Sequence, residues 1–491
     1  VERFVIVDPD ERARRIREGC AAAAAEAGGR VLEDDDLLEE VTGLVEFPTA
    51  VLGRIGVEYL NLPREVLITV MKHHQRYFSI VDDREEKVLL PHFIAISNTR
   101  GEDLGVIREG NERVLRARLE DAAYFYREDA KRPLESYVES LKSVIFQKDI
   151  GTSFEKVERI VALADWLAER LAPDQKAATE RAAKLCKADL ETRMVYEFPE
   201  LQGIMGREYA RLAGEEEVVC RAIDEHYKPR GAEDGFPSAG PAAFVGIADK
   251  LDTIVGYIAL GSLPSGSEDP FGLRRAARGV LGTILEHGYR LSLRELVHEA
   301  ATPLAHLAER LGKEQPAELE LRVQTFLNSR LENLFLAEGF RIDLIRAILE
   351  ARTGVYDIVA AKKRLEALAA ISEDKDFEPL TTTFKRVMNI IPEREEGRPQ
   401  VQEALLCEPS EKVLYAAYQE RAEKIRKLLG DEDYLAALRE IAALRPAVDT
   451  FFDDVLVMCE DEALRENRLG LLSSIGGLFA QVADFRKIAS H

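Results

Sequence analysis

The sequence predicts a multidomain, mainly α-helical protein that begins with a mixed α/β domain. Its 491 residues are enough for about three domains at roughly 100–200 residues each. From about residue 107 almost to the end, apolar residues recur with the i, i+3, i+4 spacing of helices that bury one face. Only the preceding part mixes this pattern with strand-like alternation, so the sheet is expected there.

In the amino-terminal part, a short apolar strand is expected at Phe4–Val7, followed by a helix rich in Arg, Ala and Glu. A Gly-Gly pair at 28–29 should end that helix. Residues 71–81 are expected to pass from a helix into a strand, and residues 89–97 to form another strand.

The next segment, residues 111–141, predicts one or two long helices that mix arginines, acidic residues and aromatic residues. Basic residues beside aromatic ones can grip unstacked RNA bases. Charge pairs at i, i+4 with an aromatic stripe in the core explain the same residues, and this structural interpretation is favoured. The residues in question are Arg113, Arg116, Arg118, Tyr124, Phe125 and Tyr126.

Helical periodicity continues through the remaining domains. An α/β domain with a long helical extension is expected at 1–150, and a helical domain at 151–315. A helical linker should follow at 316–380 and a carboxy-terminal helical bundle at 381–491, because the segment around 373–386 is polar and contains a proline.

Three arginines lie on one expected helix within residues 268–281. Asp269 can cap a helix there, and Pro270 suits the first helical position, where its missing N–H is not needed. Arg274 and Arg278 lie four apart on one face, and Arg275 flanks them. Such guanidiniums suit phosphate contacts. A solvated basic face that pairs with nearby acids explains the spacing equally well.

Three polar residues stand in apolar helical surroundings: Asp189, His226 and Asp249. Their order resembles the helical HD phosphohydrolase fold, which holds divalent metals through a His, an adjacent His-Asp pair and a distant Asp. Here the doublet is Ala188-Asp189, so its His is missing. We therefore expect a degenerate HD-like site without metal, in which the three side chains are buried and hydrogen-bonded.

Composition excludes several classes of protein. The five cysteines are scattered without a CxxC pair, which disfavours a disulfide framework or zinc site and fits a cytoplasmic protein. No run of 18 apolar residues implies a membrane span. The net charge of −22 argues against a dedicated nucleic-acid binder. Because salt screens charges that are more than about 8 Å apart, however, a nucleic acid would respond to local basic patches and not to the net charge of the chain. Phosphate-loop, zinc-protease, serine-hydrolase and synthetase ATP motifs are absent, so no catalytic residue is expected.

Taken together and in order, several strings resemble the β subunits of bacterial heterotetrameric (α2β2) glycyl-tRNA synthetases. The carboxy-terminal part looks like the DALR-type anticodon-binding bundle. The resemblance covers essentially the whole chain, and it implies that the amino-terminal part of the subunit is missing. The matching strings are LVEFP, MKHHQRYF, LLPHFIAISN, GNERVLRARLEDAAYFY, GTSFEKVERI, CKADLETRMVYEFPELQGIMG, HYKP, ADKLDT, DPFGLRRAARG and VDTFFDDVLVM with LRENRLGLL and ADF.

The resemblance implies a division of labour. A separate α subunit would carry ATP, Mg, glycine and the chemistry, whereas this chain, without a cofactor, would bind and position tRNA(Gly). The HD-like domain would lie near the acceptor arm and the bundle near the anticodon arm. The expected tRNA-binding residues are Lys228, Arg230, Arg274, Arg275, Arg278, Lys385, Arg386, Arg465, Asn467 and Arg468.

Three alternatives remain open at this point. An HD-type phosphohydrolase would contain metal and turn over nucleotides. A scaffold would organise α subunits without touching RNA, which the acidic balance permits. Proofreading of mischarged tRNA would need a metal or a nucleophile, and no such constellation is present in the sequence.

Overall fold

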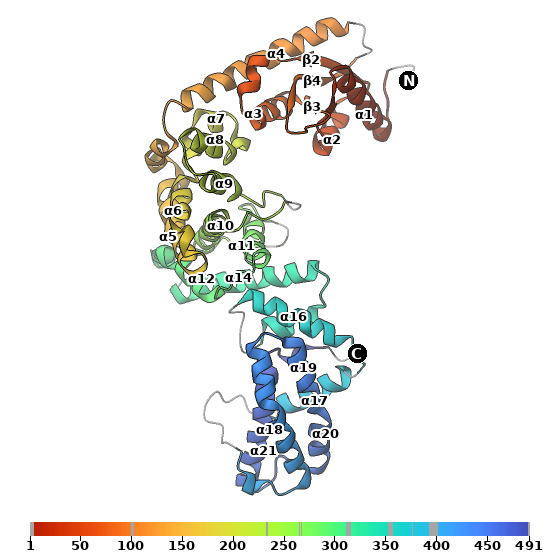
Figure 1. The fold of residues 1–491 in the computed structure, drawn as a ribbon, viewed down its shortest axis with the longest axis vertical. Helices are drawn as coiled ribbons and strands as arrows, with labels where there is room; N and C mark the ends of the chain where they lie inside the picture. The colour runs from red at the N-terminus through yellow and green to blue at the C-terminus, as the bar shows by residue number, and fades with distance from the viewer. Residues whose placement is uncertain are drawn as a thin grey trace. The chain divides into compact units, whose positions relative to one another are not determined.

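The computed structural model describes residues 4–99, 103–231, 234–264, 266, 268–310, 316–351, 357–375, 377–391 and 401–489. These residues form two compact units, and Figure 1 shows their helices and strands in order along the chain. One unit comprises Val1–Tyr227 with Pro237–Val245, and the other comprises Lys228–Phe236 with Gly246–His491. The four domain boundaries expected from the sequence stay predictions, and residue 315 lies outside the described residues.

The first unit opens with a four-stranded antiparallel sheet in the order β1-β3-β4-β2. Its strands are β1 (Gly29–Val31), β2 (Pro48–Arg54), β3 (Phe78–Asp82) and β4 (Leu89–Asn98). The predictions for β3 and β4 are confirmed. The strand expected at Phe4–Val7 is wrong, because the structure forms no strand there; the Ile6 amide donates to the Glu46 carbonyl at 2.9 Å.

One face of the sheet packs against α1 (Pro9–Glu26) and α2 (Asp35–Leu44). Helix α1 begins at the Asp8 cap and buries a stripe that includes Ile16, Cys20 and Ala24. These side chains and the apolar side of α2 form one core cluster with Phe78, Ile80 and Ile94 of the sheet. Burial of this apolar surface is the main force that holds the helices on the sheet.

Across the β2–β4 ladder, Gly53 stands opposite Phe93. A Cβ at Gly53 would lie 2.3 Å from the Phe93 ring, so only glycine fits under that ring. The ring in turn stacks on Tyr77, with 4.7 Å between centroids. The small α3 (Arg64–Thr69) and a π-helical turn (Val70–His74) connect β2 with β3.

The long helix α4 (Leu104–Asp129) packs against β2 and leads into the helical part of the first unit (Figure 1). The helices there are α5 (Ser153–Leu171), α6 (Lys176–Leu185), α7 (Arg193–Glu197), α8 (Ile204–Leu212), α9 (Glu217–Glu225) and the first turn of α10 (Pro241–Ala259). The continuous helical pattern in residues 178–196 is broken in the structure, because a 3-10 turn at Ala188–Glu191 separates α6 from α7.

Among its described residues, the second unit consists of helices joined by loops, with one isolated β-bridge between Ser292 and Asp357. After α10 come α11 (Leu273–Glu286), α12 (Leu293–Ala301), α13 (Ala305–Arg310), α14 (Pro316–Ala337), α15 (Ile342–Leu349) and α16 (Ile358–Ser372). The carboxy-terminal bundle consists of α17 (Phe377–Ile390), α18 (Pro409–Gly430), α19 (Tyr434–Ala442), α20 (Arg445–Asp454) and α21 (Glu462–Ala480).

Aromatic rings form the centre of this bundle. Phe384 of α17 meets Phe479 of α21 with 3.6 Å between ring centroids, and Phe485 packs edge-on against both. Gly476 lets α17 approach α21 closely, because a Cβ there would lie 2.8 Å from the Cδ1 atom of Ile391. Within the described ranges, no helix is both long and apolar enough to cross a membrane.

Candidate nucleic-acid interface

The arginine-bearing helix α11 begins later than its sequence suggests. Gly272, in the left-handed region with φ of 65°, precedes the first helical residue Leu273, so Pro270 lies outside the helix. Asp269 nevertheless satisfies the helix start: its two carboxylate oxygens accept from the amides of Leu273 and Arg274 at 2.8 and 2.9 Å. The predicted cap is therefore confirmed in its hydrogen bonds and wrong in its position.

The three arginines of α11 all donate to backbone carbonyls. Arg274 Nη2 reaches the carbonyl of Gly266 at 2.5 Å, Arg275 Nη1 that of Arg230 at 3.1 Å, and Arg278 Nη1 that of Gly231 at 3.1 Å. Arg275 is exposed, whereas the other two are half-buried. A carbonyl is a neutral acceptor, so these bonds orient the guanidiniums without cancelling their charge.

The loop beside α11 carries two more of the predicted residues. Lys228 and Arg230 are both half-buried, and the Arg230 and Gly231 amides donate to the Asp234 carboxylate at 2.7 and 3.0 Å. Arg278 also lies over the Phe236 ring, 5.8 Å from its centroid. The structure thus brings the five predicted basic residues of this region to one loop–helix surface within the second unit.

Sequence analysis missed a further arginine, Arg330 on α14. Burial lowers the pKa of its guanidinium, and the positive charge of Arg274 lowers it further, against the opposite effect of Asp269. Two guanidiniums held close enough to repel each other strengthen the local positive potential. Because Arg330 lies on a different helix, no spacing rule could have connected it with Arg274.

In the bundle, Arg386 and Arg465 present their charges near the surface. Arg386 of α17 is exposed, lies 4.3 Å from the centroid of the Phe452 ring and donates to the Phe452 carbonyl at 3.5 Å. Lys385 beside it is half-buried. Arg465 of α21 donates to the Cys459 carbonyl at 3.1 Å, and its nearest carboxylate, Glu462, is 4.0 Å away.

The other two predicted residues of α21 are buried. Arg468 Nε donates to Glu411 at 2.5 Å and Nη1 donates to the Leu456 carbonyl at 3.1 Å. The Asn467 amide pairs with the backbone of Gln402, accepting at 2.7 Å and donating at 3.1 Å. This geometry favours a structural role, in which both side chains fasten separate segments of the bundle together.

Asp189 is fully buried and holds the start of α8. Its Oδ2 accepts from the amides of Gly203 and Gly206 at 2.6 and 3.0 Å. Burial raises the pKa of this carboxyl from 3.8 to about 6, although the two amide bonds act in the opposite direction. The carboxylate therefore replaces the capping side chain that Gly203, the residue before α8, lacks.

His226 is buried in the same unit with both ring nitrogens engaged. Nδ1 lies 2.7 Å from the carbonyl of Ile223, so it carries the proton, and Nε2 lies 2.9 Å from Nζ of Lys187. Asp249, the third residue of the pattern, is buried in the second unit.

Asp189 Oδ2 and both nitrogens of His226 are engaged in hydrogen bonds, whereas Asp189 Oδ1 is buried with no hydrogen-bond partner among the described residues. Among the described residues, no group of three His, Cys, Asp or Glu side chains is placed to hold a metal ion. The HD-like assignment of this region stays a prediction.

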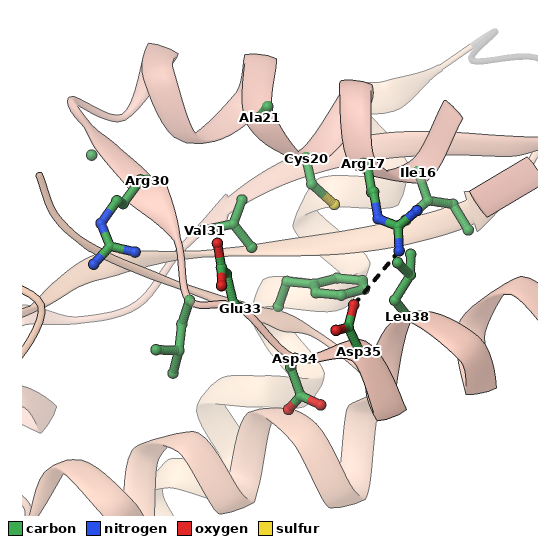
Figure 2. A pocket seen from close by; sticks show the side chains of 13 residues that line it. Ile16, Arg17, Cys20, Ala21, Arg30, Val31, Glu33, Asp34, Asp35 and Leu38 are labelled. Atoms are coloured by element: carbon green, nitrogen blue, oxygen red, sulfur yellow. Dashed lines mark ion pairs between the residues drawn. The ribbon is translucent and has the colours of Figure 1, made fainter. Parts of the chain in front are cut away.

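A pocket of about 480 Å³ lies in the first unit, between α1, β1 and the start of α2 (Figure 2). Its floor is apolar, and the ion pair of Arg17 with Asp35, 3.6 Å apart, lies beside it. Burial raises the pKa of the Cys20 thiol in its wall to about 12, so this sulfur is protonated and unreactive at neutral pH. None of the predicted site residues lines this pocket.

Two family models match the chain. The model described as glycyl-tRNA synthetase beta subunit matches residues 1–350, and the model described as DALR anticodon binding domain matches residues 380–487. The buried pair of Arg468 with Glu411 and the exposed Arg386 both fall within the second match.

Curated relatives match over nearly the whole chain. The glycine–tRNA ligase beta subunit of Geotalea uraniireducens is 50% identical over 99% of this chain and 69% of its own length. The beta subunit of Myxococcus xanthus is 48% identical over 99% of this chain and 69% of its own length. That of Syntrophus aciditrophicus is 46% identical over 100% of this chain and 70% of its own length.

Proposed function

The chain belongs to the family of glycine–tRNA ligase β subunits, and we propose that it binds tRNA(Gly) and positions it for glycylation by a separate α subunit. The observation that carries the proposal is the DALR-type bundle, whose surface presents Arg386 and Arg465 while its buried polar residues hold the helices in place. No adenylate-forming motif is present in the sequence, which supports placing ATP and Mg on the α subunit.

Positioning is a sufficient contribution to catalysis. Fixing two reactants in one geometry removes much of the entropic cost of their encounter. In this proposal, the bundle grips the anticodon arm through Lys385, Arg386 and Arg465. The loop–helix surface of Arg274, Arg275, Arg278, Lys228 and Arg230 contacts acceptor-side phosphates, with Arg330 as an addition from the structure. We further propose an α2β2 assembly in the cytoplasm.

Electrostatics gives this proposal a measurable consequence. Each phosphate that a basic side chain neutralises releases counterions, so the affinity falls as salt rises, with a slope of about −0.9 per contact on B-form DNA and about −0.7 on single strands. Because the whole chain carries a net charge of −22, electrostatic attraction to RNA has to come from local surfaces of basic side chains. Double replacement of Arg274 and Arg278 by alanine should therefore reduce both affinity and salt slope.

The experiment measures binding of labelled tRNA(Gly) and of a non-cognate tRNA to this chain across a salt series. Tighter binding of tRNA(Gly), weakening steeply with salt and reduced in the Arg386→Ala variant, is expected. The matched control is Arg84→Ala, which removes an exposed charge from the β3–β4 connection of the other unit. Equal and negligible binding of both tRNAs would contradict the proposal and favour a scaffold for α subunits.

A further inference from the structure

Two tyrosines stand unusually exposed on the first unit. Tyr196 of α7 keeps 86% of its surface accessible, and Tyr124 of α4 keeps 46%. Helix α7 packs against α4, so both rings belong to one part of the surface. Neither ring is needed in the core, where burial of aromatic surface would stabilise the fold.

The backbone under Tyr196 is held rigidly. Asp129, buried at the end of α4, accepts from the amides of Arg193 and Met194 at 3.1 and 2.9 Å and from the hydroxyl of Tyr209 at 3.1 Å. Thr192 Oγ1 accepts from the Val195 amide at 3.3 Å. These bonds fix the backbone of α7 against the end of α4.

Arg193 links the two rings. Its guanidinium carbon lies 6.0 Å from the centroid of Tyr124, and Nη1 donates to the Tyr124 hydroxyl at 3.3 Å. Tyr196 follows Arg193 by three positions, which makes the two side chains neighbours on the helix surface. Tyr124, Arg193 and Tyr196 are together named the α4–α7 surface.

The charge of Arg193 is not neutralised locally. Among the described residues it forms no ion pair within 4.0 Å, and the hydrogen bond of its guanidinium ends on a phenol. The charge of Arg193 contributes to lowering the pKa of Glu128, but the Glu128 carboxylate forms its ion pair with Lys131 at 2.5 Å. Glu197 forms an ion pair with Arg118 at 3.8 Å. Arg193 thus places a positive charge, without an ion pair among the described residues, beside the exposed Tyr124 ring and three positions before Tyr196.

We propose that the α4–α7 surface stacks an unpaired nucleotide of bound tRNA, with Tyr196 against the base and Arg193 on the adjoining phosphate. Exposed aromatic rings beside cations are the chemistry that grips single-stranded nucleic acid, since every base offers a π face and every linkage a charge. A paired helix hides its base faces and cannot use the rings. The inference rests on the proposed function and adds a contact outside the anticodon-binding bundle.

The first test compares affinities for tRNA(Gly). Tyr196→Ala should weaken binding by about 5- to 100-fold, the range for loss of one stacked base, whereas Tyr196→Phe keeps the ring and should bind like the wild type. Arg193→Ala should reduce the salt slope by about one. Leu212→Ala, which removes an exposed side chain from α8 of the same unit, should change nothing.

The second test reports stacking directly. Trp166 is the only tryptophan, so Tyr196→Trp combined with Trp166→Phe places a single fluorophore on the surface. A short single-stranded oligoribonucleotide should quench its emission, and a blunt RNA duplex of the same length should not. Leu212→Trp in the same background is the control and should respond to neither RNA.

The outcomes separate this inference from the proposed function. If Tyr196→Ala binds every RNA as the wild type does, or if strand and duplex quench alike, the stacking proposal is wrong. Loss of α-subunit binding in Tyr196→Ala with unchanged RNA binding would make the surface a protein contact instead. If the wild type binds tRNA(Gly) and the non-cognate tRNA equally and Tyr196→Ala weakens both, the proposed function of selecting tRNA(Gly) is contradicted. The stacking proposal is supported in that case.

Discussion

Replacement of Asp189 by asparagine should remove a pH dependence that the buried carboxyl imposes on the first unit. The pKa of Asp189 is about 6 in the folded protein against 3.8 for an ordinary carboxyl. The native state therefore holds the proton more tightly than the unfolded state. Its contribution to the free energy of unfolding is complete below pH 3.8, is lost as the pH rises through 6, and is constant above that.

The magnitude follows from the size of that window. Each pKa unit is worth about 1.36 kcal/mol, so the wild-type protein should lose about 2 kcal/mol of local stability between pH 4 and pH 7. Asparagine is neutral at both values and can still accept from the amides of Gly203 and Gly206. The variant should therefore match the wild type near pH 4 and be more stable at pH 7, by about 1–2 kcal/mol after allowing for weaker neutral hydrogen bonds.

Hydrogen exchange of the Gly203 and Gly206 amides is the suitable assay, because it reports local opening where a chain of two units has no single unfolding transition. After correction for intrinsic exchange, wild-type protection of these amides should decrease from pH 4 to pH 7 and that of Asp189→Asn should not. Amides of α5 serve as the internal reference. Parallel profiles in the two proteins, or a loss of protection in Asp189→Asn at every pH, would refute the reasoning.

Three further predictions follow from burial and close contact. Arg468→Ala leaves a buried carboxylate unpaired and should cost about 3–5 kcal/mol in thermal unfolding of the bundle. Gly206→Ala should destabilise the protein by about 1–3 kcal/mol, because the added Cβ would lie 2.6 Å from a core methyl group; Gly110→Ala, with nothing within 4 Å, should be neutral or stabilising in the same assay. Ellman's reagent at pH 8 should label the exposed Cys407 and spare Cys20, whose thiol pKa is about 12.

Periodicity predicted the fold well where one side of an element is buried. The mainly helical chain with an amino-terminal sheet and a DALR-type bundle is confirmed. Apolar residues at helical spacing in 154–172 and 241–260 predict two helices, and α5 and α10 lie within a residue of these bounds. The prediction failed where tertiary contacts override local pattern. The segment 178–196 has a helical spacing throughout, yet it breaks at Ala188–Glu191, where the buried Asp189 turns toward the start of α8.

The binding residues were predicted less completely, because sequence spacing reveals charge but not burial. Arg465 and Arg468 lie three positions apart in the sequence and carry the same charge. In the structure Arg468 is buried and paired with Glu411, 57 residues away in the sequence. The three aromatic residues Tyr124, Phe125 and Tyr126 were interpreted as an aromatic core stripe. That interpretation holds for Phe125 and Tyr126, which are half-buried, and fails for Tyr124, which is exposed.

The bond from Asp129 to α7 also bears on how the chain folds during its synthesis. Five residues are too few to sustain a helix alone, since nucleation consumes most of the gain from its hydrogen bonds. The Arg193 amide follows Asp129 by 64 residues, so at roughly 5–20 residues per second it leaves the ribosome about 3–13 s later. Until then the Asp129 carboxylate at the end of α4 has no amide of α7 to accept from and stays hydrated. The core between α4 and α7 is incomplete during that time. The order of translation thus lets the α4–α7 junction form only after α7 has been synthesised, and slow codons between the two segments would lengthen the exposure of that unfinished core.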